Sequence, residues 1–184
     1  MSDRPGVRFE STIPIKMRDG ITLYSDLFMP KGNGKYPVLL ERTPYNRTAP
    51  FSRGLSLDSI TAALSGYVVM IQDCRGRFES EGEFHPFVNE INDGHDTIEW
   101  IANQDWCDGN VGMFGGSYVG ATQWLAAMSQ PPALKAITPG ITASNYHEGW
   151  TYQGGAFELD FNLSWSLIHL VSANYENLVN NFGA

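Results

Sequence analysis

The sequence predicts an α/β fold in which a mostly parallel sheet carries helices on its faces. Short apolar runs at residues 37–42, 67–73 and 110–114 are typical of strands that are buried on both sides. Helical patterns separate these runs, and a chain that alternates strands with helices places the strands in parallel. With 184 residues, 42% of them hydrophobic, the chain is long enough for one domain with a sizeable core.

The N-terminal part predicts an antiparallel hairpin instead. Residues 11–17 and 21–29 alternate between apolar and polar side chains, and residues 18–20 between them form a turn sequence, Arg-Asp-Gly. A loop over residues 30–36 then leads to the first buried strand. We therefore expect a mostly parallel sheet that begins with an antiparallel hairpin.

One helix is predicted before each of the buried strands at residues 67–73 and 110–114. Residues 57–65 form the first, and Gly66 ends it as a C-terminal cap. The second begins after Asn89, its N-terminal cap, and runs to about residue 104. Its apolar residues fall on one face: Val88, Ile91, Ile98 and Ile101.

Residues 115–120, Gly-Gly-Ser-Tyr-Val-Gly, carry the most informative motif of the chain. They lie between the strand at 110–114 and a helix predicted over 121–129. A serine on a tight strand-to-helix turn between glycines is typical of the nucleophile elbow of α/β-hydrolases, although such a cluster can also be a plain turn. The elbow would lift the hydroxyl of Ser117 above the sheet and direct the first N–H groups of the helix towards the attacked bond. The strict G-x-S-x-G pattern is not met, because Val119 stands at the second glycine position.

After a short strand at residues 134–137 the sequence changes character. From residue 144 it is irregular and rich in aromatic residues: Tyr146, Trp150, Tyr152, Phe157, Phe161 and Trp165. We interpret residues 1–143 as the N-terminal part of an α/β-hydrolase domain. Residues 144–184 are then expected to begin a helical cap insertion within which the chain is truncated.

Three segments in this order resemble the cocaine-esterase and X-Pro dipeptidyl-peptidase group of α/β-hydrolases. They are residues 42–46 (Arg-Thr-Pro-Tyr-Asn), residues 73–82 (Asp-Cys-Arg-Gly-Arg-Phe-Glu-Ser-Glu-Gly) and the elbow at 115–120. The elbow of that group is typically G-x-S-Y-x-G, which accounts for Gly120. The resemblance extends over nearly all of residues 11–165 and implies the N-terminal portion of such a hydrolase.

The resemblance also implies roles for individual residues. Ser117 would be the nucleophile, and the backbone N–H of Tyr118 and the hydroxyl of Tyr45 would be the two oxyanion donors. These roles suit the chemistry, because the tetrahedral intermediate of a serine nucleophile needs two fixed donors. From the residues alone, Tyr45 could instead be a half-buried aromatic of a loop. Arg75 is expected to organise its loop by binding carbonyl groups, and Asp73 to cap local backbone groups.

The acid and base of a catalytic triad are not expected within this chain. Hydrolases of this fold order the triad as serine, acid and histidine, and the resemblance implies that the last two follow the helical insertion. Residues 177–184 carry no domain-ending signal, so the chain is predicted to be an N-terminal fragment. Asp160 and His169 follow Ser117 in the required order, but their aromatic surroundings favour a role at the surface.

Composition disfavours several other classes of function. The net charge of −8 and the absence of a basic stripe argue against binding to nucleic acid or to an anionic membrane. No apolar run reaches membrane-spanning length, and the N-terminus lacks the apolar core of a signal peptide, which favours a cytoplasmic protein. The glycines do not fit a dinucleotide-binding pattern. Three alternating glutamates predict a solvated edge rather than a paired-carboxylate site: Glu79, Glu81 and Glu83.

Cys74 and Cys107 are expected to be free thiols. One follows a strand and the other precedes a parallel strand, so they would lie at opposite ends of the sheet, beyond the reach of a disulfide. No Cys/His spacing suggests zinc, and no metal or organic cofactor is implied.

The prediction is therefore a serine hydrolase that cleaves an ester or amide bond of a small molecule or short peptide through an acyl-enzyme. Two alternatives remain open. Within the same class, the protein could be an X-Pro dipeptidyl-peptidase. From another class, it could be a non-catalytic binding module that keeps the hydrolase fold. The sequence leaves the oligomeric state open.

Overall fold

The computed structural model describes residues 6–50, 52 and 56–171. The chain divides into two compact units, Met1–Thr142 and Ala143–Ala184, and each is described by itself. The first unit contains a six-stranded sheet in the order β1-β2-β4-β3-β5-β6. In chain order its strands are β1 (Val7–Lys16), β2 (Thr22–Pro30), β3 (Tyr36–Thr43), β4 (Val68–Asp73), β5 (Cys107–Gly116) and β6 (Leu134–Gly140).

The predicted mixture of strand directions is confirmed. β1 and β2 are antiparallel, and β2 also pairs antiparallel with β4. β4, β3, β5 and β6 are parallel to one another. β5 begins three residues before the predicted start and continues two beyond the predicted end, through Gly115 and Gly116, because strand pairing does not require apolar side chains.

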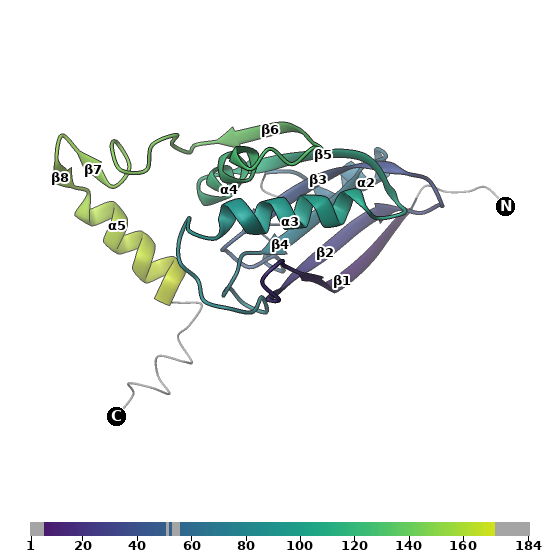
Figure 1. Cartoon of the computed structure of the whole chain (residues 1–184), viewed down its shortest axis with the longest axis horizontal. Coiled ribbons are helices and arrows are strands. Elements are labelled where there is room, and N and C mark those ends of the chain that lie inside the picture. Colours follow the sequence, from purple (N-terminus) through teal and green to yellow (C-terminus); the bar gives the residue numbers. More distant parts are fainter. Residues whose placement is uncertain (1–5, 51, 53–55, 172–184) are drawn as a thin grey trace, which may run out of the picture. The chain divides into compact units, whose positions relative to one another are not determined.

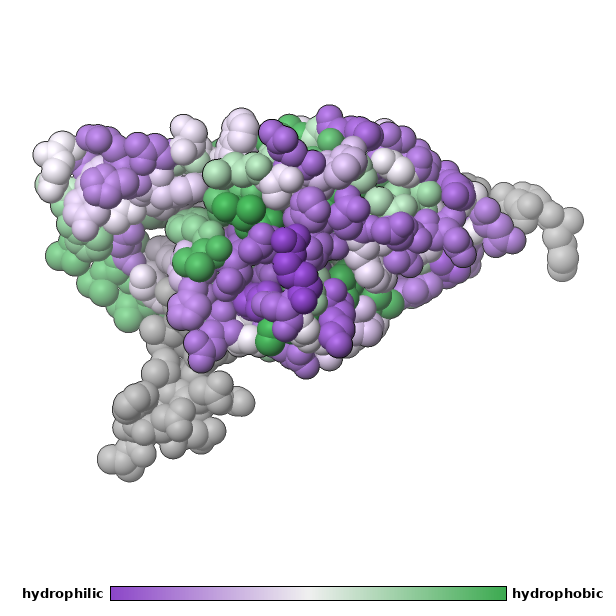
Figure 2. Space-filling model, viewed as in Figure 1, coloured by the Kyte–Doolittle hydropathy of each residue, from purple (hydrophilic) through white to green (hydrophobic). Residues whose placement is uncertain are grey.

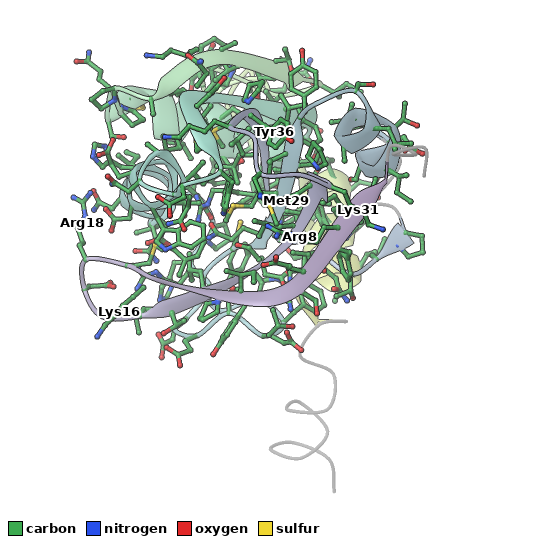
Figure 3. All side chains as sticks on the ribbon, turned by 90° about the vertical axis from the view of Figure 1, so that its right-hand side faces the viewer. Arg8, Lys16, Arg18, Met29, Lys31 and Tyr36 are labelled. Atoms are coloured by element: carbon green, nitrogen blue, oxygen red, sulfur yellow. The ribbon has the colours of Figure 1, made fainter. Side chains whose placement is uncertain are left out.

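β1 lies at one edge of the sheet, and the view in Figure 3 looks towards it. Its charged side chains Arg8 and Lys16 are exposed. The pairing of β1 with β2 is irregular between Glu10 and Ile13, where Thr12 has a φ of 59°. Charges and an irregular register both oppose the addition of a further strand, so this edge is protected against association.

Three helices of the described residues join these strands: α2 (Ser59–Leu64), α3 (Glu90–Ala102) and α4 (Tyr118–Met128). α3 and α4 pack side by side on one face of the sheet (Figure 1). The surface over α3 is mostly hydrophilic (Figure 2), as expected for the outward side of an amphipathic helix. α2 packs on the opposite face of the sheet, against β2 and β4.

The helix ends confirm the predicted cap at Gly66, and they confirm Asn89 in its position but not as a side-chain cap. Gly66 follows α2 with a φ of 91°, and its N–H donates to the carbonyl of Ala63 at 3.1 Å, as a C-terminal cap does. Asn89 precedes α3, but its side chain makes no capping hydrogen bond because its backbone is already helical. Val88 also lies before the helix and is 69% exposed, so its predicted place on the apolar face is wrong.

Two apolar layers hold the sheet. On the α3/α4 face the layer includes Val68, Met70, Ile98 and Ile101. On the other face it includes Val69 and Ile71 together with residues of α2. Alternate residues of β4 thus enter opposite layers, and the whole strand is buried. Because parallel strands end on the same side, the loops that follow β3, β4 and β5 meet at one edge of the sheet.

Both cysteines are buried free thiols, as predicted. Cys74 follows the last residue of β4, whereas Cys107 is the first residue of β5. Among the described residues, no helix is long and apolar enough to cross a membrane.

The second unit begins with a short hairpin rather than with a helix. Its elements are β7 (Tyr152–Gln153), β8 (Ala156–Phe157), α5 (Leu159–Trp165) and the π-helix η1 (Ser166–Val171). The rings of Trp150 and Phe161 meet edge to face, with centroids 5.4 Å apart. The interpretation of this unit as the start of a cap stays a prediction, and residues 177–184 lie outside the described residues.

The contact between α3 and α4 generates a prediction at Gly94. A Cβ there would lie 2.7 Å from the Cβ of Ala126 on α4. Gly94→Ala should therefore lower the thermal unfolding midpoint by a few degrees, because overpacking by about 1–3 kcal/mol outweighs a gain of about 1 kcal/mol in helix propensity. In an Ala126→Gly background the same change should destabilise the protein less, because the contact with the Cβ is gone and only the Cα of residue 126, at 3.2 Å, stays close. An equal loss in both backgrounds would show that this contact is not the cause.

Candidate active site

Ser117 occupies the turn between β5 and α4. Its backbone has φ 59° and ψ −128°, a conformation that L-residues rarely adopt. The N–H of Ser117 donates to the carbonyl of Gly140 on β6 at 2.9 Å, and its own carbonyl accepts the N–H of Ala121 at 3.1 Å. The strained turn is therefore held by the neighbouring strand on one side and by the helix on the other.

The glycines of the elbow leave room for close packing. A Cβ at Gly115, which has a φ of 119°, would lie 2.3 Å from a methyl carbon of Val119. A Cβ at Gly120 would lie 2.7 Å from the side chain of Thr142. Gly120 is thus the glycine that the packing requires, whereas Val119 fits where the strict pattern has a glycine.

The structure brings Tyr45 to the elbow. Tyr45 lies in the loop after β3, and its hydroxyl oxygen is 3.4 Å from the Oγ of Ser117, although 72 positions separate the residues. This distance is longer than a typical O–H···O bond of about 2.7–2.8 Å. The two hydroxyls therefore interact weakly with each other, and both can face one carbonyl group of a substrate, Ser117 at its carbon and Tyr45 at its oxygen.

Tyr118 is the first residue of α4, so its backbone N–H belongs to the N-terminus of that helix. Its side chain is buried and points away from the site. The hydroxyl donates to Oε1 of Glu90 at 2.9 Å and accepts the N–H of Phe87 at 2.9 Å. Burial and the neighbouring Glu90 raise the pKa of Tyr118, so the phenol stays protonated. The part of Tyr118 available for chemistry is therefore its backbone N–H.

A buried ion pair behind Tyr118 was not found from the sequence. Arg42 on β3 donates from Nη1 to Oε2 of Glu90 at 2.7 Å, and from Nε to Oε1 of Gln72 on β4 at 2.7 Å. Glu90, the first residue of α3, thereby connects Arg42 to the hydroxyl of Tyr118. The only signal in the sequence was the arginine that opens the segment 42–46.

Gln123 on α4 is a second residue that sequence reasoning missed. Its Nε2 donates to the carbonyl of Gly115 at 2.9 Å, and its Oε1 accepts the N–H of Thr138 at 2.9 Å. One buried amide thus joins the helix to the ends of β5 and β6. A glutamine in a helix that is otherwise mostly apolar was the available signal.

In the segment 73–82, the structure confirms that Asp73 binds the backbone but contradicts the partners predicted for Arg75. Asp73 accepts the backbone N–H of Arg47 at 2.7 Å, so it binds a backbone group as predicted, although that group lies 26 positions away in the sequence. Arg75 binds carboxylates instead of the predicted carbonyls: it donates to Asp93 at 2.6 Å and to Asp19 at 2.7 Å. The prediction failed because these two acids are distant in sequence, in α3 and in the hairpin turn.

The alternating glutamates are exposed, as predicted, yet two of them also bind the backbone or a buried arginine. Glu79 pairs with Arg47. Glu81 accepts the backbone N–H of Thr22 at 2.8 Å. Paired-carboxylate chemistry is not indicated, because these acids serve to attach their loop to the rest of the unit.

Within the described residues no histidine hydrogen-bonds to Ser117. His95 contacts the hydroxyl of Ser129 at 3.1 Å, and His85 lies near Glu83. Asp160 and His169 belong to the second unit, where Asp160 lies in the first turn of α5, a position that favours an acidic side chain. The expectation that these two residues have a role at the surface, and do not form a triad with Ser117, stays a prediction. The described part also holds no cluster of three or more metal-ligating side chains.

The side chain of Glu41 lies close to Gly115, the first residue of the elbow. It precedes Arg42 on β3 and is only 4% exposed. One carboxyl oxygen is 3.8 Å from the position that a Cβ of Gly115 would take. Burial raises the pKa of Glu41 to about 8, so this side chain is mainly a neutral acid at pH 7.

The mixed sheet, the strained serine turn between β5 and α4, and the glycines around it define an α/β-hydrolase. The chain matches the family described as X-Pro dipeptidyl-peptidase (S15 family) over residues 19–180, and it belongs to that family.

Similar proteins support this assignment. The chain is 46% identical over 160 residues to a cocaine esterase from Rhodococcus sp. (strain MB1 Bresler), covering 86% of this chain and 28% of that protein. A CocE/NonD family hydrolase from Staphylococcus aureus superposes with a TM-score of 0.85 at 29% identity, over 93% of this chain and 34% of the other. An α-amino acid ester hydrolase gives a TM-score of 0.69 at 31% identity, over 86% and 29%. The chain therefore spans about a third or less of the length of these relatives.

The burial of Glu41 predicts a pH-dependent stability. Its pKa is about 8 in the folded protein against 4.5 ordinarily, so its contribution to stability is complete below pH 4.5 and is lost as the pH rises through 8. We expect Glu41→Gln to remove this loss, which is on the order of a few kcal/mol. The difference in unfolding midpoint between variant and wild type should grow from pH 5 to pH 9 in thermal unfolding experiments. A difference that does not change with pH would show that Glu41 ionises normally.

Proposed function

We propose that this chain is the nucleophile-bearing part of a serine hydrolase that cleaves an ester or amide bond through an acyl-enzyme. The observation that carries the proposal is the approach of the Tyr45 hydroxyl to within 3.4 Å of the Oγ of Ser117, on a strained strand-to-helix turn. Two hydroxyl groups brought together from distant loops, beside a helix N-terminus, suit attack on a carbonyl carbon.

In the proposed reaction, Oγ of Ser117 forms a bond to the carbonyl carbon of the substrate and loses its proton to a base. The carbonyl oxygen becomes an oxyanion that accepts hydrogen bonds from the Tyr45 hydroxyl and the Tyr118 N–H. Collapse of this intermediate expels the alcohol or amine, which takes up the proton. Water then gives a proton to the base and attacks the acyl carbon. The bond to Oγ breaks, the carboxylic acid leaves, and Oγ of Ser117 takes the proton back.

The base and its acid partner would come from the remainder of a longer enzyme. A chain that spans 28% of the cocaine esterase fits a site that holds the nucleophile and the oxyanion donors only. A small-molecule ester, amide or short peptide as substrate, and a cytoplasmic location, belong to the same proposal.

An X-Pro dipeptidyl-peptidase is the second candidate, and the description of the matching family supports it. The 46% identity to a cocaine esterase favours the ester. Values of kcat/KM for an aromatic acyl ester and for an X-Pro anilide, measured on the full-length enzyme, would separate the two. A non-catalytic binding module is the outcome if a fluorophosphonate fails to label Ser117.

Ser117→Ala in the full-length enzyme should abolish turnover. Loss of a serine nucleophile is expected to lower kcat by a factor on the order of 10⁴–10⁶. The measurement is hydrolysis of an activated ester, with the thermal unfolding midpoint as a control for folding. More than a few per cent of wild-type activity would rule out Ser117 as the nucleophile.

Tyr45→Phe should lower kcat with a smaller effect on KM. Removal of one oxyanion donor typically costs a factor of about 10²–10³, or roughly 3 kcal/mol, in the transition state. The variant should still react with a fluorophosphonate at Ser117, although more slowly. A kcat within threefold of wild type would show that Tyr45 is not an oxyanion donor and is only an aromatic residue of its loop.

A further inference from the structure

We propose that two buried arginines, Arg47 and Arg77, are positioning residues that fix the hydroxyl of Tyr45 in the oxyanion hole. The inference rests on the proposed function and adds to it the residues that hold its second donor. Neither arginine was singled out by the sequence motifs for chemistry. Both are at most 2% exposed. Arg47 belongs to the same loop as Tyr45, two residues further along the chain, whereas Arg77 binds the carbonyl of Pro44, the residue before Tyr45.

The backbone around Tyr45 is held at nearly every residue. The N–H of Tyr45 donates to Oγ1 of Thr43 at 3.0 Å, and the carbonyl of Thr43 accepts the N–H of Cys74 at 2.9 Å. Asn46 has a φ of 81°, so the chain reverses immediately after the tyrosine. A left-handed residue at this place is costly and persists only where the surroundings fix it.

Arg47 fixes the part of the loop that follows Tyr45. Its backbone N–H donates to Asp73, and its guanidinium binds Asp73, Asp26 on β2 and the exposed Glu79. Three carboxylates thus surround one cation, and removal of one of them would leave a buried charge incompletely paired. The loop that carries Tyr45 is thereby attached to β2 and to the residue that ends β4.

Arg77 fixes the part of the loop that precedes Tyr45. Its Nε donates to the carbonyl of Pro44, the residue before Tyr45, at 2.9 Å. The guanidinium carbon lies 5.2 Å from the centre of the Phe78 ring and 5.1 Å from that of Phe84. The two rings favour one placement of the cation, and the planar guanidinium then directs its Nε–H to the carbonyl of Pro44.

The placement matters because the hydroxyl lies at the end of a long side chain. A small rotation of the peptide between Pro44 and Tyr45 is amplified at the oxygen. An oxyanion donor acts only within hydrogen-bond distance of the developing charge, and misplacement by about 1 Å can cost roughly 10²-fold in rate. The arginines would therefore affect kcat through Tyr45 while they touch no reacting atom themselves.

The test is a double-mutant cycle in the full-length enzyme. Arg77→Met keeps the volume and the contact with the rings but loses the bond to Pro44. We expect kcat for an activated ester to fall roughly tenfold, with KM changed less than twofold, and Arg77→Lys to recover part of the loss. In a Tyr45→Phe background, Arg77→Met should lower kcat no further, because the hydroxyl that it positions is already absent.

Arg75→Gln is the matched control, because Arg75 comes from the same segment as Arg77 but binds two carboxylates and no residue of the Tyr45 loop. Whatever its effect on kcat, that effect should be the same with and without the Tyr45 hydroxyl. Equal factors for Arg77→Met in both backgrounds would overturn the positioning role. If Arg77→Met does not fold, Arg47→Lys, which keeps the charge, is put through the same cycle with the same criterion. Full activity of Tyr45→Phe alone would instead overturn the oxyanion role of Tyr45 itself.

Discussion

The buried ion pair between Arg42 and Glu90 is the interaction on which the rest of the site depends. Both side chains are almost fully buried, and their closest atoms are 2.7 Å apart. Breaking such a pair typically costs about 3–5 kcal/mol, because the remaining charge has lost its partner. Through Gln72 and Tyr118 the pair joins β3, β4, α3 and α4, so the helix that follows the elbow has one orientation.

The elbow itself shows why such support is needed. Ser117 is kept in a conformation that its side chain disfavours, and the surroundings compensate through Gly140 on β6 and Gln123 on α4. Strain and support together place the hydroxyl at the edge of the sheet where the parallel strands end. The loop of Tyr45 is also fixed by its surroundings, in this case by hydrogen bonds of the buried residues Arg47 and Arg77.

Sequence reasoning found the elements that local patterns specify. The hairpin, the buried β4 and the cap at Gly66 all follow from hydrophobic periodicity and backbone preference within a few residues. It failed at the ends of elements: Asn89 does not cap α3 with its side chain, and Val88 is exposed. Whether a residue at the edge of a pattern is inside or outside the helix depends on the neighbouring chain, which the local sequence does not contain.

By itself the sequence determined the class of fold, the elbow with its glycines, and the family resemblance that named Ser117, Tyr45 and Tyr118. Only the tertiary structure decided the partners of the charged residues. Arg75 binds acids from α3 and from the hairpin turn, and it is Arg77 that binds a carbonyl beside Tyr45. Local periodicity reports which side chains are buried, whereas the pairing of buried charges depends on contacts between residues far apart in the chain, and only folding brings these together.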